Sequence, residues 1–121
     1  MRKRIMDREI LESVGIDYAE AEERFSGSTE LFEKFLEEMA TMNVIAALQK
    51  ALTAGDAINA FSVAHTLKGN FGNLSIKPLY NVITPLVEAV RSENMLEAQK
   101  LYIELEKEYE AVTEGIRKAI K

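Results

Sequence analysis

Apolar residues recur at helical spacing along most of this chain, and that pattern limits its fold more than any other feature. In the last segment, apolar residues alternate at spacings of four and three on one helix face: Ala98, Tyr102, Leu105, Tyr109, Val112, Ile116 and Ala119. The alternation of a strand never extends beyond a few residues, and no Asn-Gly or Asp-Gly hairpin signal occurs. The sequence therefore predicts an all-α protein.

Capping residues and glycines divide the chain into six predicted helices. Two short helices, over about 7–14 and 17–26, precede four long ones, over about 28–55, 56–74, 76–91 and 94–119. Suitable N-caps open four of them: Asp17 with Glu20 as its capping-box partner, Ser28, Asp56, and Asn94 with Glu97. Long helices joined by short turns pack beside antiparallel neighbours. We predict one domain over residues 1–121, an up-and-down antiparallel four-helix bundle with two short N-terminal helices.

The two prolines both fall in the fifth predicted helix. Pro78 suits its first turn, where no backbone donor is needed. Pro85 lies inside the helix, where proline costs about 3 kcal/mol unless the helix bends. We therefore predict a kink near residues 81–85.

Composition excludes several classes of function. The 121 residues carry a net charge of −5, whereas a nucleic-acid-binding domain concentrates positive charge on one face. No apolar stretch approaches the ~20 residues that span a bilayer, and no signal-peptide pattern opens the chain. Cysteine is absent, and the single histidine lacks the Glu-x-x-His pairing of di-metal bundles. We expect a cytoplasmic protein without metal, cofactor, membrane or nucleic-acid partner.

The predicted helix over 56–74 has two different faces. Its core stripe is Ala57, Ala60, Ala64, Leu67, Phe71 and Leu74. His65, the only histidine, points away from this stripe. Around it lie Ile58, Ser62, Gly69 and Gly72, with Phe61 and Lys68 at the flanks. The imidazole is therefore predicted to stand on the outer face of the bundle.

Three residues on this outer face together indicate chemistry. A neutral imidazole, such as His65 can provide, offers a free nitrogen lone pair. Lys68, one turn away, supplies a positive charge suited to a bound phosphate. Gly69 costs a helix about 1 kcal/mol relative to alanine, but it leaves space in which another protein can approach the ring. A lone surface histidine is usually only a solvated side chain, so periodicity alone leaves both interpretations open.

The segment His65-Thr66-Leu67-Lys68-Gly69 resembles the His-x-Leu-Lys-Gly signature of histidine-containing phosphotransfer domains. The similarity extends over roughly residues 7–120. It includes Phe25-Ser26-Gly27 before a long helix, Gly55-Asp56 before the histidine helix, and the Asn-x-x-Glu start of the last helix. Two positions depart from the family pattern. Phe71 replaces a residue that is usually small, and its angle directs it to the core. Ser75 stands where glycine is common, and it can cap the next helix.

This resemblance implies a phosphorelay intermediate. The family accepts a phosphoryl group from a receiver-domain aspartate on the outer imidazole nitrogen, here Nε2 of His65, and donates it to another receiver. Lys68 would support the phosphoryl oxygens, and Gly69 would leave room for the receiver. The partners would be receiver domains of response regulators or of hybrid histidine kinases, which supply the Mg²⁺. We expect the docking surface to be formed by Ile58, Phe61, Ser62 and Gly72.

Two alternatives share this resemblance. The chain could dock receivers without being phosphorylated, although the presence of both His65 and Lys68 counts against this. It could also be the phosphoacceptor domain of a chemotaxis-type histidine kinase. The sequence has no Gly-x-x-x-x-Gly-Lys-Ser/Thr loop for ATP, so we expect no autonomous kinase activity.

Overall fold

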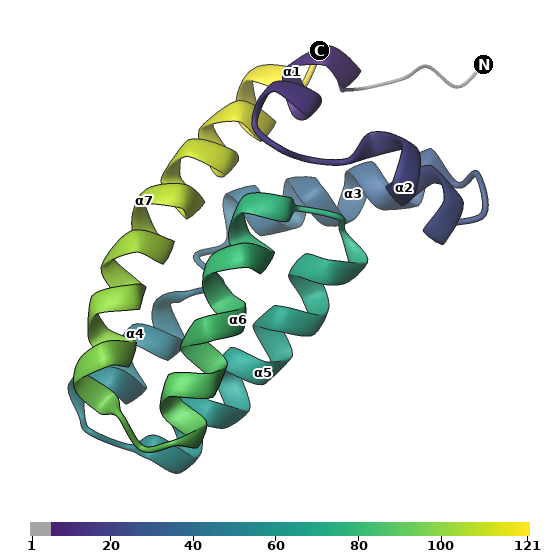
Figure 1. The fold of residues 1–121 in the computed structure, drawn as a ribbon. Coiled ribbons are helices and arrows are strands. Elements are labelled where there is room, and N and C mark those ends of the chain that lie inside the picture. The colour runs from purple at the N-terminus through teal and green to yellow at the C-terminus, as the bar shows by residue number, and fades with distance from the viewer. Residues whose placement is uncertain (1–5) are drawn as a thin grey trace.

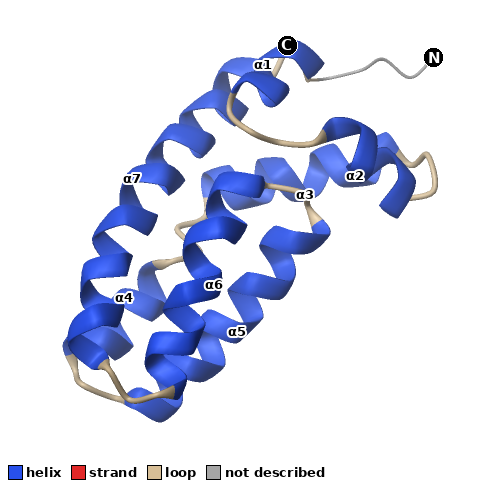
Figure 2. Ribbon diagram, viewed as in Figure 1, coloured by secondary structure: helices blue, strands red, loops and turns tan. Residues whose placement is uncertain are grey.

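The computed structural model describes residues 6–121, and these form seven helices (Figures 1 and 2). Their bounds are α1 Arg8–Ser13, α2 Tyr18–Arg24, α3 Thr29–Thr41, α4 Ala46–Thr53, α5 Ala57–Asn73, α6 Lys77–Arg91 and α7 Met95–Ala119. The predicted all-α class is confirmed. The predicted number of helices is wrong by one, because the segment expected to be one helix over 28–55 is divided into α3 and α4.

The long helices pack side by side as a four-helix bundle (Figure 1). The helix α6 lies between α5 and α7, while α3 and α4 together fill the fourth position against α7 and α5. Large apolar side chains from every element of the bundle are fully buried, among them Phe32, Leu36, Leu48, Phe71, Leu79, Leu86, Leu105 and Ile116. Burial of this continuous apolar interior stabilises the fold.

Three of the four predicted N-caps form as expected. The side-chain oxygens of Asp17, Asp56 and Asn94 accept hydrogen bonds from backbone amides three residues later, at 3.1, 3.1 and 3.2 Å. Each bond satisfies one of the free amides at a helix start. Ser28 occupies the N-cap position of α3 as predicted, but its side chain makes no capping hydrogen bond.

The break between α3 and α4 is held by tyrosines of α7. At Met42 the backbone turns to an extended conformation, with φ −109° and ψ 135°. The hydroxyl oxygen of Tyr109 lies 2.7 Å from the carbonyl oxygen of Met39 and 2.8 Å from that of Met42. The same oxygen accepts a hydrogen bond from the backbone amide of Val44 at 3.2 Å. Tyr102 donates from the same helix to the carbonyl of Ile45 at 3.2 Å. These contacts supply partners for backbone groups that the helix break leaves free.

Replacing Tyr109 with phenylalanine should therefore destabilise the protein. The substitution keeps the buried ring but removes the hydroxyl that bridges the break, and unpaired buried groups cost about 1–3 kcal/mol. Urea unfolding should show this loss in the free energy of unfolding. Tyr80→Phe is the matched control, because the exposed hydroxyl of Tyr80 makes no hydrogen bond to the described residues. Equal stability of the two variants would show that the hydroxyl does not hold the break.

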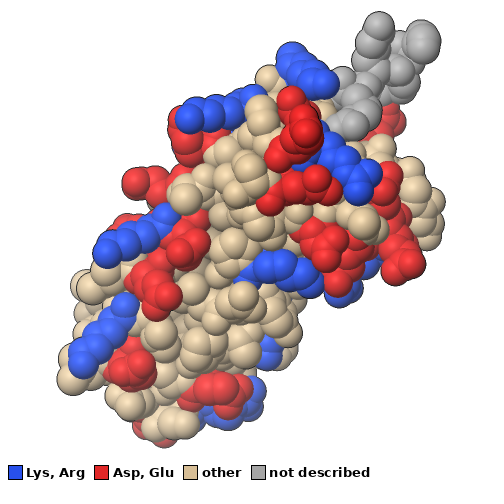
Figure 3. All heavy atoms as spheres, turned by 45° about the horizontal axis from the view of Figure 1, so that its top comes forward, with Lys and Arg blue, Asp and Glu red and all other residues tan. Residues whose placement is uncertain are grey.

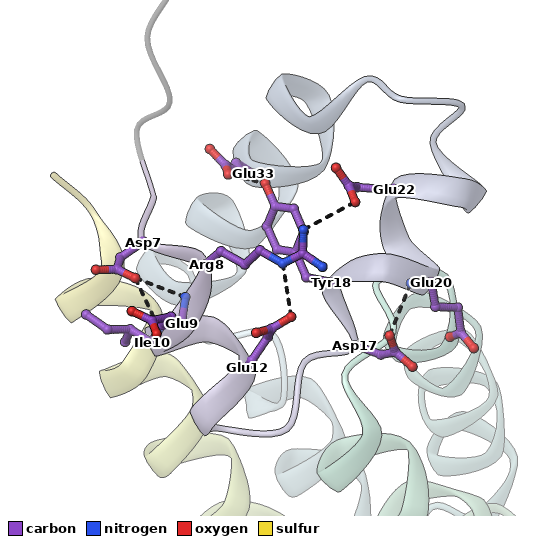
Figure 4. A network of polar contacts seen from close by, with 10 residues as sticks. All are labelled: Asp7, Arg8, Glu9, Ile10, Glu12, Asp17, Tyr18, Glu20, Glu22 and Glu33. Carbon is purple, nitrogen blue, oxygen red and sulfur yellow. Dashed lines mark hydrogen bonds and ion pairs between the residues drawn. The ribbon is translucent and has the colours of Figure 1, made fainter.

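A polar network attaches α1 and α2 to the bundle (Figure 4). The guanidinium of Arg8 binds the carboxylates of Glu12 at 3.0 Å and Glu22 at 3.5 Å, and lies 4.7 Å from the centre of the Tyr18 ring. The buried hydroxyl of Tyr18 donates to the buried carboxylate of Glu33 on α3 at 2.7 Å. This network fixes α2 over one end of the bundle, beside the end of α5.

The helix α6 continues through Pro85, with Pro78 in its first turn as predicted. The hydroxyl of Thr84 donates to the carbonyl of Tyr80 at 2.7 Å. The kink near residues 81–85 remains a prediction.

Charges of both signs alternate on the face shown in Figure 3, and no continuous basic surface appears on it. Among the helices that the structure describes, none has the combined length and apolarity that crossing a membrane requires.

Candidate functional site

The helix α5 presents His65 on the side opposite its core stripe. Ala60, Ala64, Leu67 and Phe71 are buried, whereas His65 is exposed. The predicted two-faced helix is thus what the structure contains. Phe71 is only 1% exposed, which agrees with its expected position in the core. The departure from the family pattern at this residue therefore lies in the core and not on the exposed face that carries His65.

A hollow of about 430 Å³ begins beside His65 and extends towards the C-terminal end of α5. Its walls come from three helices and the turn between α5 and α6: Arg24, His65, Lys68, Gly69, Phe71, Gly72, Asn73, Ser75, Ile76, Lys77 and Tyr80. The predicted site residues His65, Lys68, Gly69 and Gly72 all lie in this one hollow. The remaining predicted residues, Ile58, Phe61 and Ser62, lie on the preceding turns of the same helix.

The imidazole of His65 has an aromatic neighbour and no hydrogen-bonding partner within the described chain. Its ring stacks on that of Phe61, with the centroids 5.6 Å apart and an angle of 28° between the planes. Stacking covers one face of the imidazole but leaves its edge free, and both ring nitrogens lie at that edge. The ring can therefore offer a nitrogen lone pair to an external group.

Lys68 and Gly69 border the hollow on the C-terminal side of His65. Lys68 is half-buried, and in the part of the chain that the structure describes its ammonium group has no carboxylate partner. A Cβ atom added at Gly69 would have no other atom within 4 Å. Glycine at this position is therefore not required for packing within the monomer. A free positive charge and an open space lie together on one side of the imidazole.

Gly72 has a packing role that the sequence did not indicate. A Cβ atom added there would approach Tyr80 of α6 to 3.2 Å, so glycine allows the aromatic ring to lie against α5. Gly72 is half-buried under this contact. Its part in partner binding stays a prediction, and the close approach of Tyr80 is a packing reason for glycine at this position.

Glu20 binds three residues that line the far end of the hollow, which the sequence did not predict. Its carboxylate accepts hydrogen bonds from the Ser75 hydroxyl at 2.7 Å and from the Lys77 ammonium at 2.9 Å, and it lies 3.5 Å from the Arg24 guanidinium. These partners lower the pKa of Glu20 to about 2, with the hydrogen bond from Lys77 as the largest cause. The predicted capping box is thus only half formed. Asp17 caps α2, but the side chain of Glu20 crosses to the α5–α6 turn.

The same network explains Ser75. Its backbone has a φ of +57°, a conformation that favours glycine. The expected cap is wrong, because Ile76 occupies the N-cap position of α6 and the Ser75 hydroxyl binds Glu20 instead. Of the three cations that line the hollow, Arg24 and Lys77 are thus paired with Glu20, and Lys68 is the unpaired one within the described residues.

We expect replacement of Glu20 by glutamine to change how stability depends on pH. Because the folded-state pKa is lowered from 4.5 to about 2, the ionised carboxylate stabilises the fold above about pH 4.5, and this contribution is lost as the pH falls towards 2. Urea unfolding across this range should show wild type more stable than Glu20→Gln near neutral pH, with the difference shrinking below pH 4.5. A constant difference at all pH values would contradict the assigned pKa.

The described residues contain no group of three or more His, Cys, Asp or Glu side chains placed to hold a metal ion. The arrangement beside His65 is that of a nucleophile next to a cation, on a helix face open to a visiting molecule.

The fold is a helical bundle, and its site is one exposed imidazole beside a glycine and a lysine that is unpaired among the described residues. This is the arrangement of a protein that presents a reactive histidine on the surface of a helix. A family model described as the Hpt domain matches residues 30–115, from the start of α3 almost to the end of α7. The chain therefore belongs to the Hpt domain family and has a histidine phosphotransfer role in phosphorelay. No curated protein sequence and no solved structure matched it.

Proposed function

We propose that this chain is a phosphorelay intermediate in which His65 accepts a phosphoryl group from an aspartyl phosphate of one receiver domain and donates it to the aspartate of another. The observation that carries the proposal is the free imidazole edge of His65 beside the unpaired ammonium of Lys68. A neutral ring nitrogen attacks phosphorus, an N–P bond forms, and the bond between phosphorus and the aspartate oxygen breaks. The freed aspartate keeps the electron pair, and the attacking ring, which becomes cationic when the N–P bond forms, releases the proton on its other nitrogen to the solvent. The return step reverses these changes.

Lys68 and Gly69 have separate roles in this transfer. The ammonium of Lys68 stabilises negative charge on the phosphoryl oxygens, both in the transition state and on phosphorylated His65. The missing side chain at Gly69 leaves the space through which the receiver brings its aspartate and Mg²⁺ to the ring. Phosphoryl transfer needs mainly positioning and charge stabilisation, which these groups and the receiver together supply.

The receiver docks on the turns of α5 that precede His65. Ile58 lies two turns before His65 on the same side of the helix and is 87% exposed, the largest fraction among the exposed large apolar residues of the described chain. Ser62 is also exposed on this face. A small apolar surface beside a reactive group fits a partner that must bind and then leave.

The proposal is tested by mixing the chain with a receiver domain charged with radiolabelled acetyl phosphate. We expect the label to appear on the chain and to be lost in acid but kept in base, as for a phosphoramidate and unlike an acyl phosphate. A second, uncharged receiver should then remove it. Tight receiver binding without labelling would instead identify a non-catalytic docking module. Labelling by an ATP-bound kinase domain but by no receiver would identify a kinase phosphoacceptor domain.

Lys68→Ala should slow labelling without abolishing it. Loss of a charge-assisted contact to the phosphoryl oxygens should lower the first-order transfer rate by about tenfold, and Lys68→Arg should retain most of it. Rapid-quench measurements at saturating phosphorylated receiver give this rate. Lys107→Ala, which removes an exposed lysine of α7, serves as the control. Equal rates for the variants of Lys68 and Lys107 would remove Lys68 from the proposed mechanism.

A further inference from the structure

Three side chains form a layered stack that ends at His65. The imidazole lies on the ring of Phe61, one turn earlier in α5, at 5.6 Å between centroids. Helical side chains lean towards the N-terminus, so the side chain of one residue covers that of the residue four positions before it. On the ring of Phe61, the guanidinium carbon of Arg91 from α6 lies 4.9 Å from the ring centre.

The stack links two helices of the bundle. Phe61 is half-buried and packs against the core. Arg91 is held in turn by Glu88, with 3.2 Å between its Nε atom and the carboxylate. Phe61 thus has support from the core and from the cation of α6, while His65 rests on it as the outermost member. The exposed ring of His65 thus packs on a side chain that is itself held by the core and by α6.

No hydrogen bond from the described residues orients the imidazole. In many reactive histidines a carboxylate or carbonyl acceptor on one ring nitrogen fixes the ring and its tautomer. Here the ring of Phe61 is the aromatic neighbour that the imidazole has among the described residues. The sequence placed Phe61 on the docking surface. The structure gives it an orienting contact with the proposed phosphoryl acceptor.

We propose that Phe61, supported by Arg91, is a positioning residue that holds His65 in the orientation from which its free nitrogen reaches the phosphoryl group. The proposal rests on the function proposed above. A ring held against Phe61 keeps its edge towards the open side of the helix and spends less time in unproductive rotamers. Restriction of this kind raises the rate of the bound complex and leaves receiver affinity nearly unchanged.

The test compares Phe61→Leu, which keeps an apolar side chain but removes the aromatic ring, with Phe61→Tyr, which keeps the ring. Two quantities are measured for each: the first-order transfer rate at saturating phosphorylated receiver, and the receiver dissociation constant. Aromatic pairs have energies that correspond to a change of about threefold to tenfold. We expect Phe61→Leu to slow transfer by that factor with little change in affinity. Phe61→Tyr should keep the wild-type rate. Arg91→Gln should also slow transfer, by a smaller factor than Phe61→Leu.

The NMR chemical shifts of the His65 ring protons report directly on the contact with Phe61, and a purely structural role of Phe61 would leave them unchanged. His65 is the only histidine, so its two carbon-bound ring protons are identified without ambiguity in an NMR spectrum. Ring-current shifts from Phe61 should be present in wild type and Phe61→Tyr and lost in Phe61→Leu, while thermal unfolding shows that each variant is folded.

Two results would overturn the positioning role. One is a wild-type transfer rate in Phe61→Leu despite loss of the ring-current shifts. The other is a Phe61→Leu variant with weaker receiver binding but a wild-type transfer rate at saturation. That result would make Phe61 part of the docking surface and not a positioning residue. Failure of wild type itself to accept the label would instead reject the proposed function, so the two failures are distinguishable.

Discussion

His65→Gln should abolish phosphoryl transfer from a charged receiver to this chain. Glutamine has no nitrogen lone pair that can attack phosphorus under these conditions, and no second histidine exists to replace it. The folded state should be little affected, because His65 is exposed and makes no hydrogen bond to the described residues. We expect the free energy of unfolding to stay within about 1 kcal/mol of wild type.

The measurement combines labelling with binding. Wild type and His65→Gln are offered the same charged receiver, and bound label is counted before and after acid treatment. Receiver affinity is measured separately, and it should change little because Ile58 and its neighbours remain. Acid-labile label on His65→Gln at the wild-type level would end the assignment of His65 as the phosphoryl acceptor. Loss of both binding and stability would show that His65 has a structural role.

Gly69→Ala should make the protein more stable and less active. An alanine Cβ at this position meets no atom within 4 Å, so the helix gains the difference in propensity, about 1 kcal/mol, without strain. The same methyl group lies where we propose that the receiver approaches His65. Displacement of the reacting groups by about 1 Å can cost about 100-fold, and we expect alanine to slow transfer by at least about tenfold. Gly69→Leu should slow it further.

Higher stability together with a lower transfer rate distinguishes this prediction from a general loss of structure, which would lower both. Urea unfolding and rapid-quench transfer are measured on the same preparations, with Gly72→Ala for comparison. At Gly72 the added Cβ would press on Tyr80 at 3.2 Å, so that variant should gain less stability or lose some. Undiminished transfer in both Gly69 variants would mean that no partner closes over this part of α5.

Local sequence signals predicted most of the elements that build the site. Asp56 caps α5 and apolar spacing sets its buried face, and both depend only on residues within a few positions of one another. The same spacing placed His65 outside the core. Lys68 and Gly69 share its side of the helix for the same reason, and the structure gives them the expected free charge and open space.

The sequence did not predict contacts between helices. Tyr109 reads as one more core position, yet its hydroxyl bridges carbonyls up to 70 positions away and divides one predicted helix into two. Glu20 reads as a capping partner on a solvated surface, yet it binds Lys77, 57 positions later. Such partners are distant in the chain and have no periodic signature.

The sequence by itself therefore determined that this chain is helical, which helix faces are buried, and that its one imidazole stands outside beside a lysine and a glycine. These properties follow from periodicity and capping, which act over one or two helical turns. Only the tertiary structure decided what surrounds that imidazole: the support of Phe61 by Arg91, and the pairing of Glu20 that leaves Lys68 as the hollow's unpaired cation among the described residues. Those partners meet because packed helices bring together side chains that the chain itself keeps far apart.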